Sequence, residues 1–356
     1  MSEKSISFRS HLVSNTADLI KEIDLHCART SYLIAGIVSQ LAAYTEEGVS
    51  MTPSVFICNS ISELIQRAGV GEYVPLSKEV PLESAGPALL KAAAPLCRDN
   101  WRIYIERLDD SKNCRYGVFC GSSDPSSLTV DEVILENDGS SIKFPVIRIA
   151  QSSTNKVEVR TNAGSVIEFR FNDDIDVHEL NSQTQIQGLA STIAADIDKE
   201  HRVMFSNFVE RLLSSAIKNS HGTLIAVVPS SNDALPQTLQ DFVQLNPKVN
   251  LYERFRLHLD EGKTAVSVSR LQAAVELISG FICSDGITIF NRAGCVLGYR
   301  AFIRSNVDNP SSEGGARSRA FTAMNQLVGT ELDAAFFKSQ DGQVKFFRNC
   351  LEDKTQ

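Results

Sequence analysis

The spacing of hydrophobic positions changes several times along the chain, and each change predicts a different element. Between residues 12 and 44 apolar side chains recur every three or four positions, which predicts a long helix. Alanine and leucine dominate residues 83–96, which predicts a second helix. Short apolar or alternating runs predict strands, which lie at residues 54–58, 101–108, 116–120, 132–136, 144–150, 156–160 and 166–171. The first half of the chain therefore predicts an α+β domain whose last three strands form a meander.

A polar and then alanine-rich stretch separates this part from the rest of the chain. From Leu180 to about His201 the pattern predicts a connecting helix rather than a flexible linker. We therefore predict an N-terminal domain over residues 1–200 and a C-terminal domain over residues 201–356. A chain of 356 residues is also long enough for two hydrophobic cores.

The C-terminal part alternates helices with strands. The predicted helices carry their apolar faces at Phe205–Ala216, Leu271–Ile278 and Ala320–Leu327. The predicted strands are Thr223–Pro229, Ile287–Phe290, Cys295–Phe302, Ala334–Lys338 and Gln343–Arg348, the last two joined by the turn Asp341-Gly342. This order predicts a mixed-sheet α/β domain with helices on both faces of one sheet.

Composition narrows the function classes. The net charge of −8 disfavours a general DNA- or RNA-binding surface, because no basic excess is present to neutralise a phosphate backbone. The eight cysteines form no C-x-x-C pair and no zinc-ligand spacing, which indicates reduced thiols. The most apolar helical stretch, residues 32–44, is shorter than the roughly 20 residues that cross a bilayer. We therefore expect a cytoplasmic protein without a membrane partner.

Two short motifs near the end of the chain carry the candidate chemistry. Ser284-Asp285-Gly286-Ile287 is an acidic turn before a strand, and its carboxylate is the type of ligand that divalent cations take. Gly314-Gly315-Ala316-Arg317-Ser318-Arg319 opens a helix with two glycines and two arginines. Helix N–H groups and guanidinium groups both bind phosphate, so the pair of motifs favours a nucleotide. Each motif alone is more typical of an ordinary turn or loop.

The order of these motifs resembles a known family. Residues from about 203 to 348 are similar to the catalytic domain of diadenylate cyclases, whose marks are Asp-Gly-Ala and Gly-Thr-Arg-His-Arg. Here these marks stand as Asp285-Gly286-Ile287 and Gly315-Ala316-Arg317-Ser318-Arg319. Ile287 replaces a small alanine that in this family lies close to the nucleotide, which implies a narrower or reshaped base pocket. Ala316 and Ser318 replace a threonine and a histidine, while Asp285 and both arginines are kept.

The resemblance implies a specific reaction and specific roles. Two ATP molecules would condense into cyclic di-AMP with release of pyrophosphate. Asp285 would hold Mg²⁺ or Mn²⁺, and Arg317 and Arg319 would grip the triphosphate together with the N–H groups at Gly315 and Ala316. Gly286, Ile287 and Ser318 complete the implied nucleotide site. Each domain would bind one ATP, so the resemblance implies a homodimer or higher oligomer with face-to-face sites.

Two further hypotheses stay open at this point. A catalytically inactive nucleotide sensor derived from the same fold is favoured by the changes at Ala316 and Ser318. A purely structural dimerisation module would bind no nucleotide at all. By analogy with chains of this family, residues 1–200 are interpreted as a sensor or regulatory domain whose ligand the sequence does not name.

Overall fold

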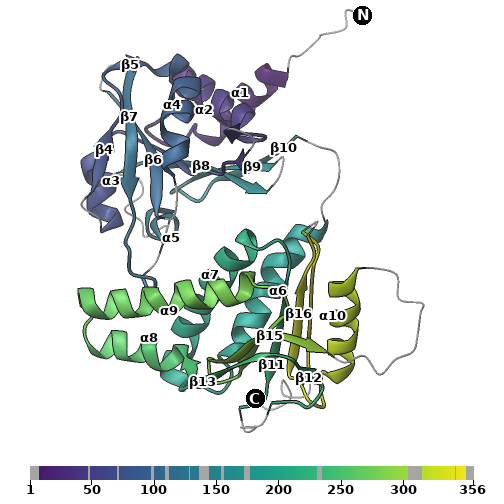
Figure 1. The fold of residues 1–356 in the computed structure, drawn as a ribbon. Coiled ribbons are helices and arrows are strands. Elements are labelled where there is room, and N and C mark those ends of the chain that lie inside the picture. The colour runs from purple at the N-terminus through teal and green to yellow at the C-terminus, as the bar shows by residue number, and fades with distance from the viewer. Residues whose placement is uncertain are drawn as a thin grey trace, which may run out of the picture. The chain divides into compact units, whose positions relative to one another are not determined.

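The chain forms two compact units, which comprise Met1–Ser123 with Ser127–Asp174, and Asp124–Ser126 with Ile175–Gln356. A computed structural model describes residues 8–46, 49–69, 72–97, 100–108, 112–127, 129–135, 144–153, 156–171, 177–230, 235–303, 315–340 and 342–349. Helices and strands mix in both units (Figure 1). The predicted α+β fold class is therefore confirmed.

The first unit is built on one twisted mixed sheet. Its strand order is β10-β9-β8-β3-β6-β7-β4, and β5 also pairs with β7. Among the described strands of this sheet, β3 and β6 alone pair in parallel, with Phe56 opposite Tyr104. The strands are β3 (Val55–Cys58), β4 (Tyr73–Pro75), β5 (Val80–Pro81), β6 (Trp101–Arg107), β7 (Asn113–Cys120), β8 (Ile147–Ser153), β9 (Lys156–Thr161) and β10 (Val166–Arg170). A separate hairpin joins β1 (Thr45–Glu46) to β2 (Val49–Ser50).

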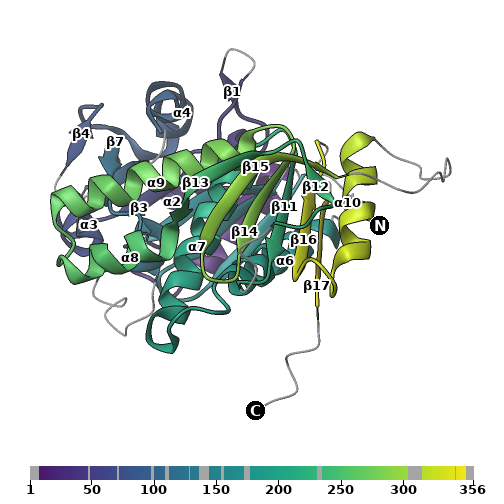
Figure 2. The ribbon, with the colours of Figure 1, turned by 60° about the horizontal axis from the view of Figure 1, so that its bottom comes forward.

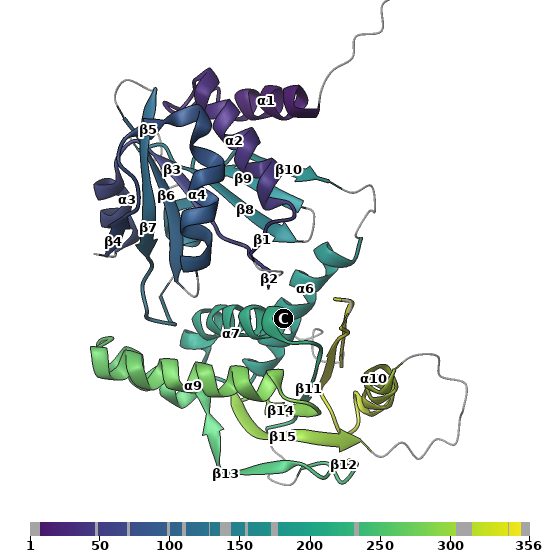
Figure 3. The same ribbon diagram turned by 45° about the horizontal axis from the view of Figure 1, so that its top comes forward.

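Helices cover both faces of this sheet because its strands alternate between two hydrophobic clusters. Val55 and Ile57 face the larger cluster, which α1 (Phe8–Leu19), α2 (Ala28–Leu41) and α4 (Ala85–Ala93) cover together with the short turn η1 (Leu82–Ser84). A second short turn, η2 (Ala94–Leu96), follows α4. Phe56 and Cys58 face the smaller cluster, which α3 (Ile61–Ala68) and α5 (Val130–Leu135) cover. Figure 3 shows α2 and α4 lying across one side of the strands.

Two predictions for this unit are wrong. Residues 12–44 form two helices rather than one, because the chain breaks after Leu19 and Cys27 caps α2 by accepting a hydrogen bond from the Thr30 N–H. The predicted strand 132–136 is the helix α5 over its described residues. Thr129 and Glu132 form a reciprocal capping box there, with Thr129 N donating to Glu132 Oε2 and Glu132 N donating to Thr129 Oγ1.

The second unit contains one seven-stranded sheet among its described residues. Its order is β12-β15-β14-β11-β16-β17, and β13 also pairs with β15. Central β11 is parallel to β14 and antiparallel to β16, and all six of its residues are buried, as expected for a strand covered on both faces. The strands are β11 (Thr223–Val228), β12 (Leu239–Gln240), β13 (Val243–Asn250), β14 (Ile287–Asn291), β15 (Cys295–Ile303), β16 (Ala334–Lys338) and β17 (Val344–Arg348).

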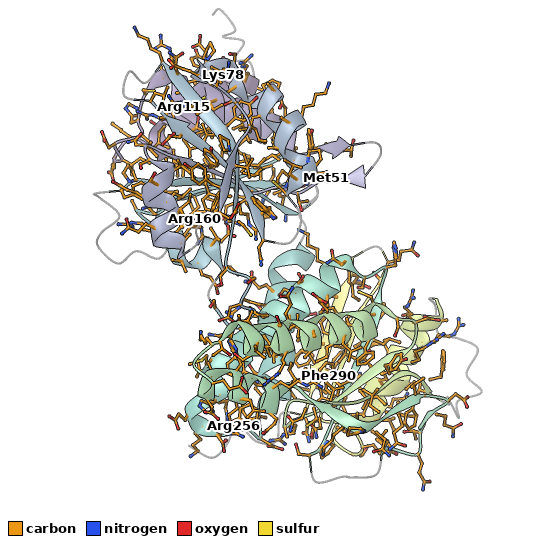
Figure 4. The ribbon with its side chains drawn as sticks, turned by 60° about the vertical axis from the view of Figure 1, so that its left-hand side comes forward. Met51, Lys78, Arg115, Arg160, Arg256 and Phe290 are labelled. Atoms are coloured by element: carbon orange, nitrogen blue, oxygen red, sulfur yellow. The ribbon has the colours of Figure 1, made fainter. Side chains whose placement is uncertain are left out.

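Helices lie on both faces of this second sheet, as predicted (Figure 2). The larger cluster lies under α6 (Val177–Ile193), α7 (Lys199–Asn219), α8 (Leu251–Asp260) and α9 (Ala265–Cys283). Phe290 of β14 belongs to it and lies in the interior of the unit (Figure 4). Helix α10 (Ala316–Leu327) covers the opposite face through Phe321 and Met324. The sequence predicted neither β13 nor α8.

The boundary between the units differs from the predicted position at residue 200. Helix α6 belongs to the second unit, because Leu189, Ala190 and Ile193 are buried in the same cluster as α7. Three residues from further upstream, Asp124–Ser126, also belong to the second unit.

The segment Asp124–Ser126 is held by a buried histidine. The His258 ring lies 3.0 Å from Asp124 Oδ1 and 3.0 Å from Ser126 Oγ through Nε2, and 2.8 Å from Ser267 Oγ through Nδ1. His258 is therefore a buried residue whose two ring nitrogens both have hydrogen-bond partners.

Candidate functional site

The turn that carries Asp285 is fixed by hydroxyl groups at the end of α9. The Phe281 carbonyl accepts hydrogen bonds from Ser284 Oγ at 2.6 Å and from Thr288 Oγ1 at 3.0 Å. Thr223, at the start of β11, donates to the next carbonyl along the helix at 2.8 Å. These bonds satisfy carbonyls that the helix end leaves without partners, so Asp285 projects from a well-anchored turn.

Gly286 lets this turn pack directly on the neighbouring strand. Its φ is +96°, and a Cβ atom there would lie 2.8 Å from both Cα and the carbonyl carbon of Arg300. No side chain fits in that space, and the backbone conformation itself favours glycine. The acidic turn therefore requires Gly286 for two independent reasons.

The structure brings the two sequence motifs together through one ion pair. Arg317 Nη2 donates to Asp285 Oδ1 at 3.2 Å, across 32 positions of sequence. The Asp285 side chain is 68% exposed and that of Arg317 is 38% exposed, so both groups remain accessible to a ligand. Arg317 also lies along Gly222, where an added Cβ would be 3.4 Å from Arg317 Nη1.

The first turn of α10 presents backbone donors beside this pair. Gly315 is the N-cap in extended conformation, no side chain caps the helix, and the Arg319 N–H donates to the Gly315 carbonyl at 3.1 Å. Within the part of the chain that the structure describes, no acceptor binds the N–H groups of Ala316, Arg317 or Ser318. These donors and the positive end of the helix dipole favour an anion.

The remaining predicted site residues differ in their accessibility. Arg319 and Ala316 are exposed and Ser318 is half-buried, all on the first turn of α10. Ser318 uses its carbonyl to accept a hydrogen bond from Thr322 Oγ1 at 3.1 Å. Gly314 lies outside the described residues.

Ile287 is placed differently from the prediction. Its side chain is 1% exposed and packs in the cluster beneath α10 with Phe321 and Met324. A residue on a central strand directs its side chain into the core when that face is covered, and α10 covers this one. Ile287 therefore packs in the core between the acidic turn and α10, and it does not line an open pocket.

A divalent cation fits this site only together with a ligand. Among the described residues, no group of three or more His, Cys, Asp or Glu side chains is arranged to hold a metal. Asp285 supplies one carboxylate, and Mg²⁺ is commonly held by one or two carboxylates plus substrate phosphates and water. A phosphate-bearing ligand would supply the oxygen atoms that the protein does not.

The backbone of Lys338 lies beside Gly222, next to the site. The Lys338 ammonium donates to the Ile217 and Ser220 carbonyls at the end of α7, and burial lowers its pKa. The backbone carbonyl of Lys338 would lie 3.1 Å from a Cβ at Gly222. Nothing in the local sequence pattern reveals this approach of Gly222 to β16, because it depends on how the strand packs in the fold.

Comparison with known proteins adds no assignment. No protein-family model matches the chain, and no curated protein is significantly similar to it. Of the described helices, α9 alone has the length and apolar composition of a membrane span, a property that core helices of soluble proteins share. Five of its apolar residues are buried in the second unit, including Leu271, Ile278 and Ile282.

Proposed function

We propose that the second unit binds a nucleoside triphosphate and acts as a diadenylate cyclase-like nucleotidyltransferase. The observation that carries the proposal is the contact of Asp285 with Arg317 beside the open first turn of α10. An acidic group, guanidinium groups and free backbone N–H groups at one place form a combination suited to a polyphosphate. The resemblance in motif order supports ATP as the nucleotide and cyclic di-AMP as the product.

The reaction consists of two successive nucleotidyl transfers. The 3′-hydroxyl of one ATP attacks the α-phosphorus of the other, the bond to the β-phosphate oxygen breaks, and pyrophosphate leaves. The hydroxyl proton is accepted by a base, for which Asp285 is the candidate. A repeat of the step from the second ribose closes the ring. Bound Mg²⁺ or Mn²⁺ would neutralise part of the phosphate charge.

The protein's contribution is alignment and charge neutralisation. Arg317 and Arg319 on one helix turn would bind phosphate oxygens while the N–H groups of Ala316 and Ser318 fix their position. One chain supplies one such set of groups, whereas the reaction needs two ATP molecules facing each other. The proposal therefore includes a homodimer or higher oligomer, at least during turnover.

The test is incubation of the full-length protein with ATP and Mn²⁺ or Mg²⁺, with products identified by mass spectrometry. Asp285→Asn and Arg317→Met should abolish cyclic di-AMP while their thermal melts stay close to that of the wild type. Arg256→Met is the matched control, because Arg256 also forms exposed ion pairs, with Glu253 and Asp260 at 2.9 and 2.8 Å on α8 (Figure 4). Equal product from the wild type and Asp285→Asn would refute the site.

A nucleotide sensor without turnover is the second candidate. It is favoured by Ala316, which has no side-chain donor on the helix turn where the family has threonine. This candidate predicts saturable ATP binding with no release of pyrophosphate. Absence of any nucleotide binding would instead favour a structural dimerisation module.

The proposal extends to the setting of the protein. We place the protein in the cytoplasm, where ATP is available, with no DNA, RNA or membrane among its partners. The first unit would act as the sensor that regulates the second, an assignment that rests on analogy with other chains of this family.

A further inference from the structure

An irregularity in β15 lies directly against the acidic turn. Between the pairs Ile287↔Ala301 and Ile289↔Gly298, one residue of β14 faces two residues of β15, Tyr299 and Arg300. This is a β-bulge, and Arg300 has a φ of +59°. Bulges of this kind redirect a side chain out of the regular alternation and are enriched beside functional sites.

Arg300 is held in position by its neighbours while its own side chain is exposed. Tyr299 stacks on Phe281 with ring centroids 4.5 Å apart, and Ala301 is fully buried on the other face of the sheet. The Arg300 backbone packs against Gly286, because a Cβ atom added to Gly286 would lie only 2.8 Å from the Arg300 Cα. Arg300 is thus fixed next to the residue that follows Asp285.

The choice of arginine at this position has no explanation in the packing of the unit. Left-handed backbone is disfavoured for residues with a Cβ and is tolerated best by glycine and asparagine. Lys263 shares this conformation, but its ammonium lies 3.6 Å from Asp124. The Arg300 side chain forms no hydrogen bond or ion pair with any residue that the structure describes. A cation kept in a strained conformation beside a candidate site indicates a ligand outside the protein.

We propose that Arg300 is a third cation for the polyphosphate of the bound nucleotide. This inference rests on the function proposed above and adds a residue from β15 to a site otherwise built from the α9–β14 turn and α10. Arg300, Arg317 and Arg319 would then provide three positive charges against the single negative charge of Asp285. A site with this net positive charge recognises the phosphates of the ligand and does not discriminate between nucleotide bases.

The experiment compares ligand affinities by calorimetry in the full-length protein. Arg300→Asn removes the charge while keeping a residue that tolerates left-handed backbone, and Arg300→Lys keeps the charge. Lys263→Asn makes the same change at the other exposed basic residue with this backbone. Arg317→Met reports on the proposed site itself, and thermal melts verify folding. ATP, inorganic tripolyphosphate and adenosine are the probes.

We expect Arg300→Asn to weaken ATP and tripolyphosphate binding by at least about fivefold, because a charge-assisted phosphate contact is lost. Arg300→Lys should recover most of this affinity, while Lys263→Asn and adenosine binding should be unaffected. Unchanged ATP affinity in Arg300→Asn, with weakened binding in Arg317→Met, would overturn the role of Arg300 and leave the proposed function standing. No binding of ATP or tripolyphosphate by the wild type would overturn both.

Discussion

Asp285 and Arg317 form an ion pair in which Arg317 Nη2 lies 3.2 Å from Asp285 Oδ1, so each group neutralises the charge of the other. A phosphate that binds Arg317 must therefore displace a carboxylate, whereas a cation bound to Asp285 would release the guanidinium. Binding of an anion and binding of a cation at this site are consequently coupled, and the coupling acts in both directions.

This coupling predicts an unusual effect of Asp285→Asn on binding. In EDTA the variant should bind ATP about two- to fivefold more tightly than the wild type, the range for an exposed ion pair. Loss of the Asp285 charge also favours anion binding without any part played by the ion pair. The effect of Asp285→Asn is therefore measured again in an Arg317→Met background, in which the ion pair cannot form. The gain should be smaller there. An equal gain in both backgrounds would show that the ion pair itself has no part in binding.

Gly286→Ala should destabilise the second unit. The substitution combines a positive φ with a Cβ only 2.8 Å from the Arg300 backbone, and we expect a loss of about 1–3 kcal/mol in the free energy of unfolding. Gly280→Ala, on the exposed face of α9 with open space around it, is the control and should be neutral or stabilising. Urea denaturation followed by circular dichroism measures both. Equal stability of the two variants would contradict the close packing of the turn.

Ile287→Ala tests whether Ile287 narrows the base pocket, as the sequence suggests, or serves as a core residue, as its burial indicates. If Ile287 narrowed the base pocket, alanine would raise ATP affinity. Because the side chain is buried beneath α10, we expect no gain in affinity and a loss of about 2–5 kcal/mol in stability. Val266→Ala, at a side chain 59% exposed on α9, should change stability by less than about 0.5 kcal/mol. Calorimetric titration with ATP decides between the two interpretations.

The cysteines should differ widely in reactivity. Burial raises the pKa of the Cys114 thiol to about 12 and also raises that of Cys58, so both should resist alkylation in the folded protein. Cys283, at the end of α9, is exposed and should react first among the cysteines that the structure describes. Brief treatment with iodoacetamide followed by peptide mass spectrometry gives the order. Labelling of Cys58 at the rate of Cys283 would mean that the first sheet opens readily.

Hydrophobic spacing predicted the elements whose burial follows a simple period. Helix α7 shows one apolar face, and the β16–β17 hairpin surrounds an Asp-Gly turn, so both were predicted close to their observed bounds. The strand expected at residues 132–136 was wrong because its short apolar run suits either element, and the Thr129–Glu132 capping box decided for a helix. Strand β13 went unnoticed because most of its residues are exposed at the edge of the sheet.

The candidate site was likewise predicted only in part from the sequence. Spacing alone could not establish that Asp285 meets Arg317, since the contact depends on how α10 crosses the sheet. The motif order nevertheless selected both residues. Arg300 gave no signal in the sequence, because a bulge is set by the register of two strands and not by a local pattern. The burial of Ile287 gave no local signal for a related reason, because it depends on the packing of α10.

The contribution of Asp124–Ser126 and α6 to the second unit has a practical consequence for protease and expression experiments. A fragment that starts at residue 201 would lack Leu189 and Ile193, which are part of the hydrophobic cluster. In such a fragment His258 would also lose its partners Asp124 and Ser126. Such a fragment should be poorly soluble for reasons unrelated to regulation. The second unit includes Asp124–Ser126 from the sequence that precedes it, so the proposed regulation by the first unit is better studied by point substitutions in the intact chain than by deletion.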